Sequence, residues 1–364
     1  MYRPSFLLTA LLFIAASCRQ EEKPLTKAEA LDFAKKVEIS IGKRDGKMLD
    51  DAIDQKAFYK KMNLESGSDA RSFQAGLKKG MNMGTKITES LSAKGSYDLV
   101  KHYEKDKIHH LLFRLYDEGS LNYHDYELTR ANDQPKVADI YIYMSGENLS
   151  ETLKNLFTQF KDEFKAGADH ETASWIKRMP DIRSLINKGK QKEALDIYNS
   201  MPQKVRNGRM FQIIHVEISS GLSGDEYSRA ISEYQTLYPN EPNMQLILID
   251  GYILRKEYGK ALDAVNELDK MIDKDPLLDF HRAMCYTLMK NDVKRVECLE
   301  RLLKNLPDFE DGILELLADY LETRQFEKAK PLVDRFRSRS EFNQSTLTLL
   351  LTQHPGYTEK SGAQ

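Results

Sequence analysis

A 34-residue period in the C-terminal half constrains the fold of this 364-residue chain more than any other feature. Three tyrosines lie 34 residues apart, and a small residue begins an apolar stripe in the second half of most copies. The positions that define the period are Tyr252, Tyr286, Tyr320, Ala194, Ala230, Ala261 and Ala329. Apolar residues follow each alanine at spacings of three and four, which place side chains on one helix face. Because a helical pair cannot bury such a face alone, the pattern predicts stacked hairpins.

The period and its small and aromatic positions resemble the tetratricopeptide repeat family. Arg295 stands where the family has an alanine, and the family's early tryptophan is missing from these copies. The resemblance implies an all-α solenoid of helical hairpins over residues 181–352, with helix breakers such as Pro276 and Pro307 at the joins. It also implies a concave face that binds an extended segment of a protein partner.

The first 17 residues differ from the rest of the chain. A basic Arg3 precedes an apolar run that ends at Ala16, too short to span a bilayer as a helix. The run leads into Ala15-Ala16-Ser17-Cys18 and resembles a bacterial lipobox, although the family usually has leucine where Ala15 stands. The resemblance implies a signal peptide over residues 1–17 and a palmitate-bearing Cys18 that holds the protein on the membrane. The alternative is an ordinary secretory signal that happens to end before a cysteine.

A polar tether over residues 18–25 follows the lipobox. Its segment from Arg19 to Pro24 looks like the acidic export signals that send some gram-negative lipoproteins to the cell surface. An inward-facing periplasmic anchor is the alternative. Either orientation predicts an outer-membrane lipoprotein of the cell envelope.

Residues 26–165 predict an α+β domain of helices followed by a four-stranded antiparallel sheet. Thr26 and Glu29 form a capping box, and Asp69 is expected to cap one long helix through Leu91. A period of two then marks strands over residues 97–103, 107–116, 121–129 and 136–144, with turn residues at each short join. The order of elements over residues 26–147 resembles the NTF2-like, or cystatin-like, folds. Residues 166–180, with the lone Trp175, are expected to form a linker helix, and residues 353–364 a disordered tail.

The NTF2-like resemblance implies a cone whose mouth could bind a small ligand. The candidate pocket residues are His110, Arg114 and His124. Acid–base chemistry would need two such groups to converge, and His109 and His110 must point to opposite faces of their strand. The simpler interpretation is that all of these are solvated or partly buried strand residues. No cofactor or metal motif is found, and unpaired core thiols are favoured over a disulfide between Cys285 and Cys298.

With 54 basic and 56 acidic residues, the chain lacks the basic surplus that nucleic-acid binding requires. These features together predict an envelope-anchored, non-catalytic scaffold that binds a protein through its repeats. An alternative function is a ligand-binding or enzymatic NTF2-like domain with accessory repeats. A third, glycan capture, would need clustered aromatic residues, against which the single Trp175 argues.

Overall fold

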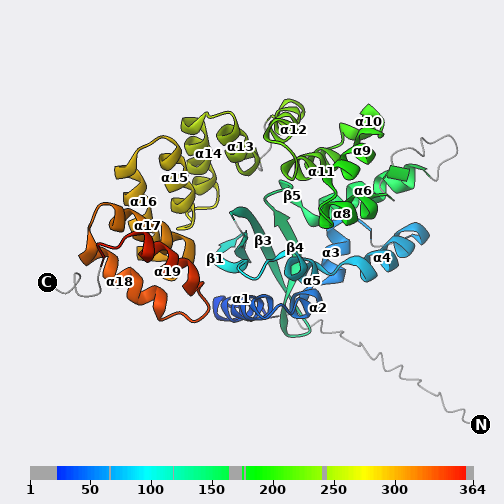
Figure 1. Ribbon diagram of the computed structural model, residues 1–364. Helices are drawn as coiled ribbons and strands as arrows, with labels where there is room; N and C mark the ends of the chain where they lie inside the picture. The colour runs from blue at the N-terminus through cyan, green and yellow to red at the C-terminus, as the bar shows by residue number, and fades with distance from the viewer. Residues whose placement is uncertain are drawn as a thin grey trace, which may run out of the picture.

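The computed structural model describes residues 23–64, 67–117, 119–163, 174–175, 178–239 and 244–357. It contains N-terminal helices, an antiparallel sheet and a long helical region, in the predicted order. The helices of the C-terminal half bend in an arc around the sheet, and the N-terminal helices close the opposite side (Figure 1). The predicted signal peptide, Cys18, most of the predicted linker and the last seven residues lie outside the described residues.

In the described residues before the sheet, the helices are α1 (Lys27–Gly42), α2 (Lys47–Ala52), α3 (Gln55–Lys61), α4 (Ser68–Gly80) and α5 (Met83–Ser90). The predicted capping box begins α1: the Glu29 N–H donates to Thr26 Oγ1 at 3.2 Å, and the Thr26 N–H donates to Glu29 Oε2 at 2.8 Å. Phe33 and Val37 of α1 lie on one helix face and are buried against the sheet.

The prediction of one long helix from Asp69 to Leu91 is wrong, because this segment forms two helices, α4 and α5. The chain leaves the helical conformation at Met81 and Asn82, and Asp69 lies inside α4 rather than at its cap. Helix α5 packs closely against α2. A Cβ atom on Gly84 would lie 2.1 Å from the Gly46 carbonyl oxygen, so only glycine permits this approach of α2 and α5.

The sheet has the order β1-β2-β3-β4-β5, with every neighbouring pair antiparallel. Its strands are β1 (Ser96–Lys105), β2 (Ile108–Asp117), β3 (Ser120–Ala131), β4 (Gln134–Ile142) and β5 (Glu147–Asn148). The four predicted strands are confirmed, whereas the two-residue β5 was not predicted. Asn132 and Asp133 both have positive φ, of 53° and 58°, as a two-residue hairpin turn requires.

The two faces of the sheet pack against different parts of the chain. Leu111, Phe113 and Tyr126 lie on the face toward α1, in one buried cluster with that helix. Leu112 and Tyr123 lie on the other face and belong to the core of the helical repeats. The sheet is therefore buried on both sides.

Helix α6 (Leu149–Glu163) leads out of the sheet, and the helical repeats follow it. Their helices are α8 (Met179–Asn187), α9 (Gln191–Asn199), α10 (Gln203–Arg206), α11 (Arg209–Ser220), α12 (Gly224–Leu237), α13 (Met244–Leu254), α14 (Tyr258–Met271), α15 (Leu278–Leu288), α16 (Asp292–Asn305), α17 (Glu310–Glu322), α18 (Phe326–Arg337) and α19 (Gln344–Gln353). Trp175 packs against the first pair, α8 and α9, with the Arg178 guanidinium 4.7 Å from its ring centre.

The residues that define the period lie at matching places in successive hairpins. Ala194, Ala230, Ala261 and Ala329 are fully buried, in α9, α12, α14 and α18. Tyr252, Tyr286 and Tyr320 lie in α13, α15 and α17. The buried thiols of Cys285 and Cys298 are free, and burial raises the pKa of Cys285 to about 11.

Candidate interaction site between the sheet and the repeats

A buried ion pair joins the sheet to the repeats. Arg114 of β2 donates from Nη1 to Asp275 Oδ1 at 2.6 Å, and from Nη2 to Asp98 Oδ2 at 3.0 Å. Tyr123 of β3 donates from Oη to Asp275 Oδ2 at 2.8 Å. Burial, followed by the nearby Asp275 carboxylate, raises the pKa of Tyr123 well above its usual value. Both oxygens of Asp275 are thus occupied by groups of the sheet.

Local structure at the start of α15 holds Asp275 in this position. Its Oδ1 also accepts the Leu277 N–H at 3.0 Å, and its own N–H donates to Asp269 Oδ1 at 2.9 Å. Asp273 and Lys274 just before it have φ of 56° and 78°, which turns the chain tightly after α14. The carboxylate is therefore oriented by main-chain contacts as well as by Arg114.

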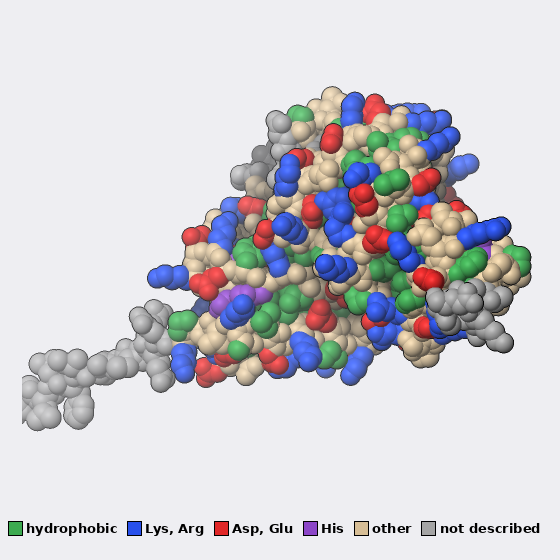
Figure 2. All heavy atoms as spheres, turned by 90° about the vertical axis from the view of Figure 1, so that its left-hand side faces the viewer, with side chains coloured by type: hydrophobic (Ala, Val, Ile, Leu, Met, Phe, Trp, Pro, Cys, Tyr) green, Lys and Arg blue, Asp and Glu red, His purple; other side chains and the backbone are tan. Residues whose placement is uncertain are grey.

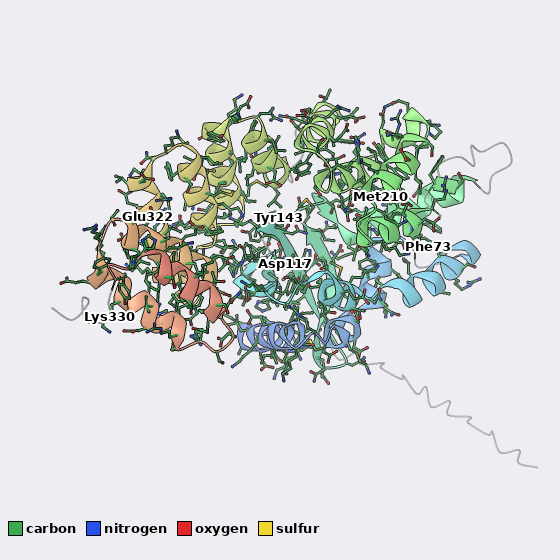
Figure 3. The ribbon with its side chains drawn as sticks, in the orientation of Figure 1. Phe73, Asp117, Tyr143, Met210, Glu322 and Lys330 are labelled. Carbon is green, nitrogen blue, oxygen red and sulfur yellow. The ribbon has the colours of Figure 1, made fainter. Side chains whose placement is uncertain are left out.

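A second set of contacts lies one repeat further along. Tyr116 of β2 donates from Oη to Asp311 Oδ2 at 3.2 Å, and its ring meets the ring of Phe309 edge-on with 5.4 Å between centres. Lys94 Nζ lies 3.5 Å from Glu310 Oε1. Tyr143, which follows β4 and is labelled in Figure 3, packs against the core that the sheet shares with the repeats.

A cleft of about 1070 Å³ opens beside these contacts. Strand β1 and the segment before it form one wall, and the loops that precede α15, α17 and α19 form the other. Its lining residues include Lys94, Ser96, Asp98, Leu99, Val100, Arg114, Tyr116, Asp275, Leu306, Asp308, Phe309, Glu310, Asp311, Glu341 and Phe342. Figure 2 views the molecule from the side of the C-terminal repeats, and shows hydrophobic side chains lying among charged ones of both signs.

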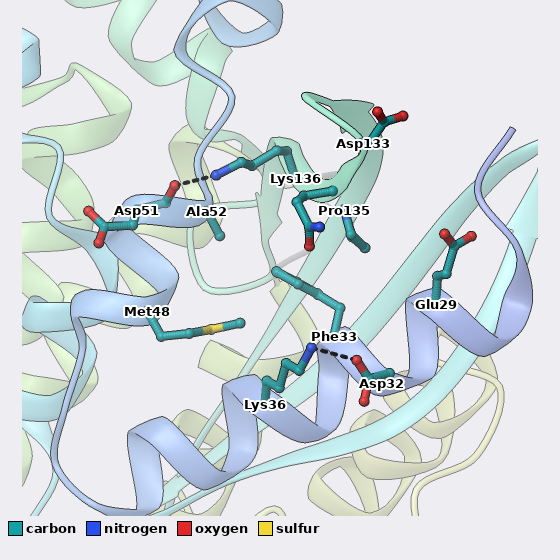
Figure 4. A pocket seen from close by; sticks show the side chains of 11 residues that line it. Glu29, Asp32, Phe33, Lys36, Met48, Asp51, Ala52, Asp133, Pro135 and Lys136 are labelled. Carbon is teal, nitrogen blue, oxygen red and sulfur yellow. Dashed lines mark hydrogen bonds and ion pairs between the residues drawn. The ribbon is translucent and has the colours of Figure 1, made fainter. Parts of the chain in front are cut away.

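A smaller hollow of about 280 Å³ lies between α1, α2 and the β3–β4 turn (Figure 4). Partners are found for four of its charged side chains: Glu29, Asp32, Lys36 and Lys136. Lys36 Nζ lies 2.6 Å from Asp32 Oδ2, and Lys136 Nζ donates to the Asp51 carbonyl oxygen at 2.7 Å. Hydrogen bonds lower the pKa of Glu29 to about 2, and the largest effect comes from Arg130, followed by Thr26.

The structure separates the three predicted pocket residues. His110 and Arg114 lie on the face toward the repeats, whereas His124 lies on the face toward α1. His110 Nδ1 is 3.3 Å from Asp125 Oδ1, and its ring stacks on Tyr103. Arg114 is held by its two aspartates.

His124 is part of the core on the α1 side. Its Nδ1 is 3.0 Å from Tyr97 Oη, and burial lowers its pKa to about 4. His109 and His110 do point to opposite faces, since His109 Nε2 lies 2.8 Å from the Leu25 carbonyl oxygen. Phe113 and Tyr126 are fully buried in the core on this same face.

Sequence reasoning missed Asp275, Asp98, Tyr116 and Asp311. One signal was present: Arg114 stands between Leu112 and Tyr116 in an alternating strand whose face is apolar, and a buried arginine needs a carboxylate partner. The sequence could not say which carboxylate, because Asp275 before Pro276 has the pattern of an ordinary turn residue.

Among the described residues, no group of three or more His, Cys, Asp or Glu side chains is arranged to hold a metal ion. No helix in the described part of the chain is long and apolar enough to cross a membrane. Comparison of the chain with family models, with curated proteins and with solved structures finds no match. Its function is therefore argued from the cleft and the contacts around it.

Proposed function

We propose that this protein is a lipoprotein of the outer membrane, held at the cell envelope by a lipid on Cys18, that acts as a non-catalytic scaffold and binds a protein partner through its repeats. The observation that supports the proposal is the open cleft of about 1070 Å³, which the sheet and three repeat loops line together. Specific protein interfaces need apolar contact area together with a polar rim, and the cleft has both.

The finer family assignments belong to the same proposal. Helical pairs with matching alanines and with tyrosines 34 residues apart support a tetratricopeptide-like array. Helices followed by an antiparallel meander support an NTF2-like domain. Fold alone does not assign an activity, so these resemblances only help to locate the binding surface.

The partner surface differs from that of an open solenoid. Between α13 and α17 the repeats share a core with Leu112, Tyr116 and Tyr123 of the sheet, so this part of their surface is already covered. The cleft is the open surface next to it. The alternative function, a small ligand held by the sheet, would need His110, Arg114 and His124 to converge, and their separation lends it no support.

The anchor and the scaffold are tested separately. Replacing Cys18 by Ala should move the protein from the membrane fraction to the soluble fraction, whereas Gln20→Ala should leave it on the membrane. Persistent membrane association of the Cys18→Ala protein would refute the lipid anchor.

The scaffold is tested by cross-linking the full chain in intact envelopes and identifying what it binds. The full chain is needed because a fragment with only the repeats would expose the side chains that pack on the sheet. One protein should be enriched reproducibly at low and high salt. If none is enriched, the scaffold proposal fails.

A further inference from the structure

Strand β1 forms one edge of the sheet and also one wall of the cleft. Ser96, Asp98, Leu99 and Val100 all line the cleft. Successive side chains of a strand point to opposite faces, so a hollow that touches both Asp98 and Leu99 borders the edge of the strand and not only one face. The cleft therefore runs along the outer main chain of β1.

The outer edge of β1 carries main-chain groups that no strand pairs with in the described part of the chain. The Leu99 N–H donates to Glu38 Oε1 of α1 at 2.7 Å, so this donor points away from β2. The register shifts between Leu99 and Lys101, and Val100 is left without a partner on β2. An unpaired edge is a template for another extended segment.

The opposite wall of the cleft carries both apolar and acidic side chains. Leu306, Phe309 and Phe342 provide apolar contact area. Six acidic and two basic residues line the cleft, and both basic residues, Lys94 and Arg114, already contact carboxylates of the lining. Asp98, Asp308 and Glu341 have exposed side chains, at 45%, 44% and 62%. Arg339, beside the cleft, pairs with Asp308 and lies 3.9 Å from Glu341. With Arg339 counted, the six carboxylates of the lining still outnumber the basic groups that contact them. Such a site attracts positive charge.

We propose that the cleft binds an extended, basic segment of the protein partner, which adds to β1 as a further strand. The main chain of the segment pairs with the edge of β1, and the Leu99 N–H exchanges the Glu38 carboxylate for a peptide carbonyl. Side chains on one face of the segment contact Phe309 and Phe342. Its lysines or arginines contact the exposed sides of Asp308 and Glu341, next to Arg339, which already pairs with both. This inference rests on the proposed scaffold function and specifies the chemistry of its partner.

The first test uses synthetic peptides and the full chain in detergent. The probe is a labelled peptide of alternating lysine and valine, as long as β1, and binding is followed by fluorescence anisotropy. A peptide of alternating glutamate and valine should bind at least about tenfold more weakly, because it carries the charge of the cleft. Two further probes carry N-methyl groups on all lysines or on all valines. One of them should lose binding, since a strand donates to β1 only from alternate N–H groups.

Variants of the chain separate strand addition from simple attraction of charge. Asp308→Lys combined with Glu341→Lys should weaken binding of the lysine–valine peptide about tenfold. Asp263→Lys, on the exposed side of α14 and outside the cleft, is the matched control and should leave binding unchanged. Glu38→Ala should tighten binding about threefold, because it removes the competitor for the Leu99 N–H. If the peptide bound by charge attraction alone, Glu38→Ala would instead weaken its binding, because the change removes a negative charge.

Several outcomes would overturn the inference. It is wrong if both N-methylated peptides bind like the parent, or if Glu38→Ala weakens binding. It is also wrong if β1 instead pairs with a second copy of this chain. In that case the Asp308→Lys change would abolish the dimer, and none of the peptides would compete with dimer formation. A further outcome is that the full chain captures an envelope partner equally well with and without the Asp308→Lys and Glu341→Lys changes. That result would support the scaffold proposal and contradict the proposed strand-addition site.

Discussion

Arg114 and Asp275 lie 161 positions apart in the chain and meet in a buried ion pair with 2.6 Å between Nη1 and Oδ1. One belongs to a central strand and the other to the loop before α15. The side chain of Asp275 is fully buried, and that of Arg114 is 8% exposed. Through this contact the α+β region and the repeats share one core rather than forming two independent units.

Breaking this ion pair should destabilise the whole chain. Asp275→Asn leaves Arg114 with a buried charge and only Asp98 beside it, so the free energy of unfolding should fall by about 3–5 kcal/mol. Urea unfolding measures the change. Arg183→Ala, which removes an exposed ion pair with Glu217 at 3.4 Å, is the control and should cost less than about 1 kcal/mol. Equal effects of the two changes would mean that the sheet and the repeats are not coupled through Asp275.

His124 should make stability fall in mild acid. Burial lowers its pKa to about 4, below the 6.5 of an ordinary histidine, so the unfolded chain binds this proton more readily than the folded one. The contribution is lost as pH falls from about 6.5 to 4, and reaches on the order of 3 kcal/mol. His124→Gln should flatten this part of the curve of unfolding free energy against pH. An unchanged curve for His124→Gln would contradict the assignment.

The contact of Gly46 with Gly84 should tolerate no side chain. Gly84→Ala puts a Cβ atom 2.1 Å from the Gly46 carbonyl oxygen, so α2 and α5 must move apart at a cost of about 1–3 kcal/mol. Gly259→Ala is the matched control, because nothing lies within 4 Å of its added Cβ. The control should raise the free energy of unfolding by about 0.5–1 kcal/mol, since alanine favours the helix. Thermal unfolding measures both changes: the melting temperature should fall for Gly84→Ala and rise for Gly259→Ala.

The two buried thiols should be inert in the folded protein. Burial raises the pKa of both Cys285 and Cys298, and the thiolate is the reactive form. A thiol-specific reagent should therefore label both residues only in denaturant, at a rate at least about tenfold above the native rate. An intact mass two hydrogens lower, with no labelling in denaturant, would reveal a disulfide instead.

Local pattern was enough to predict the strands and the repeats. Alternation around Leu111, Phe113 and Leu115 marks β2, and the alanine spacing marks the packed sides of the repeat helices, because both follow from short-range periodicity. The capping box at Thr26 is local in the same way.

What could not be predicted depends on contacts between distant segments. Helix α5 packs against α2 where Gly84 approaches Gly46, a contact that no window around residue 81 contains. Asp275 became a site residue only because Arg114 reaches it from a strand far back in the chain. The three residues expected to share a pocket have suitable chemistry, but strand alternation and burial place His124 on the other face.

The spacing of the contacts on β2 also limits how the chain can change length. Arg114 and Tyr116 are two positions apart on one strand face, and their partners Asp275 and Asp311 are one hairpin apart in the array. Inserting or deleting a hairpin between these partners would leave one of the two strand residues without its aspartate. An open solenoid can gain or lose whole hairpins. In this protein the spacing of Arg114 and Tyr116 on β2 fixes the number of hairpins between Asp275 and Asp311.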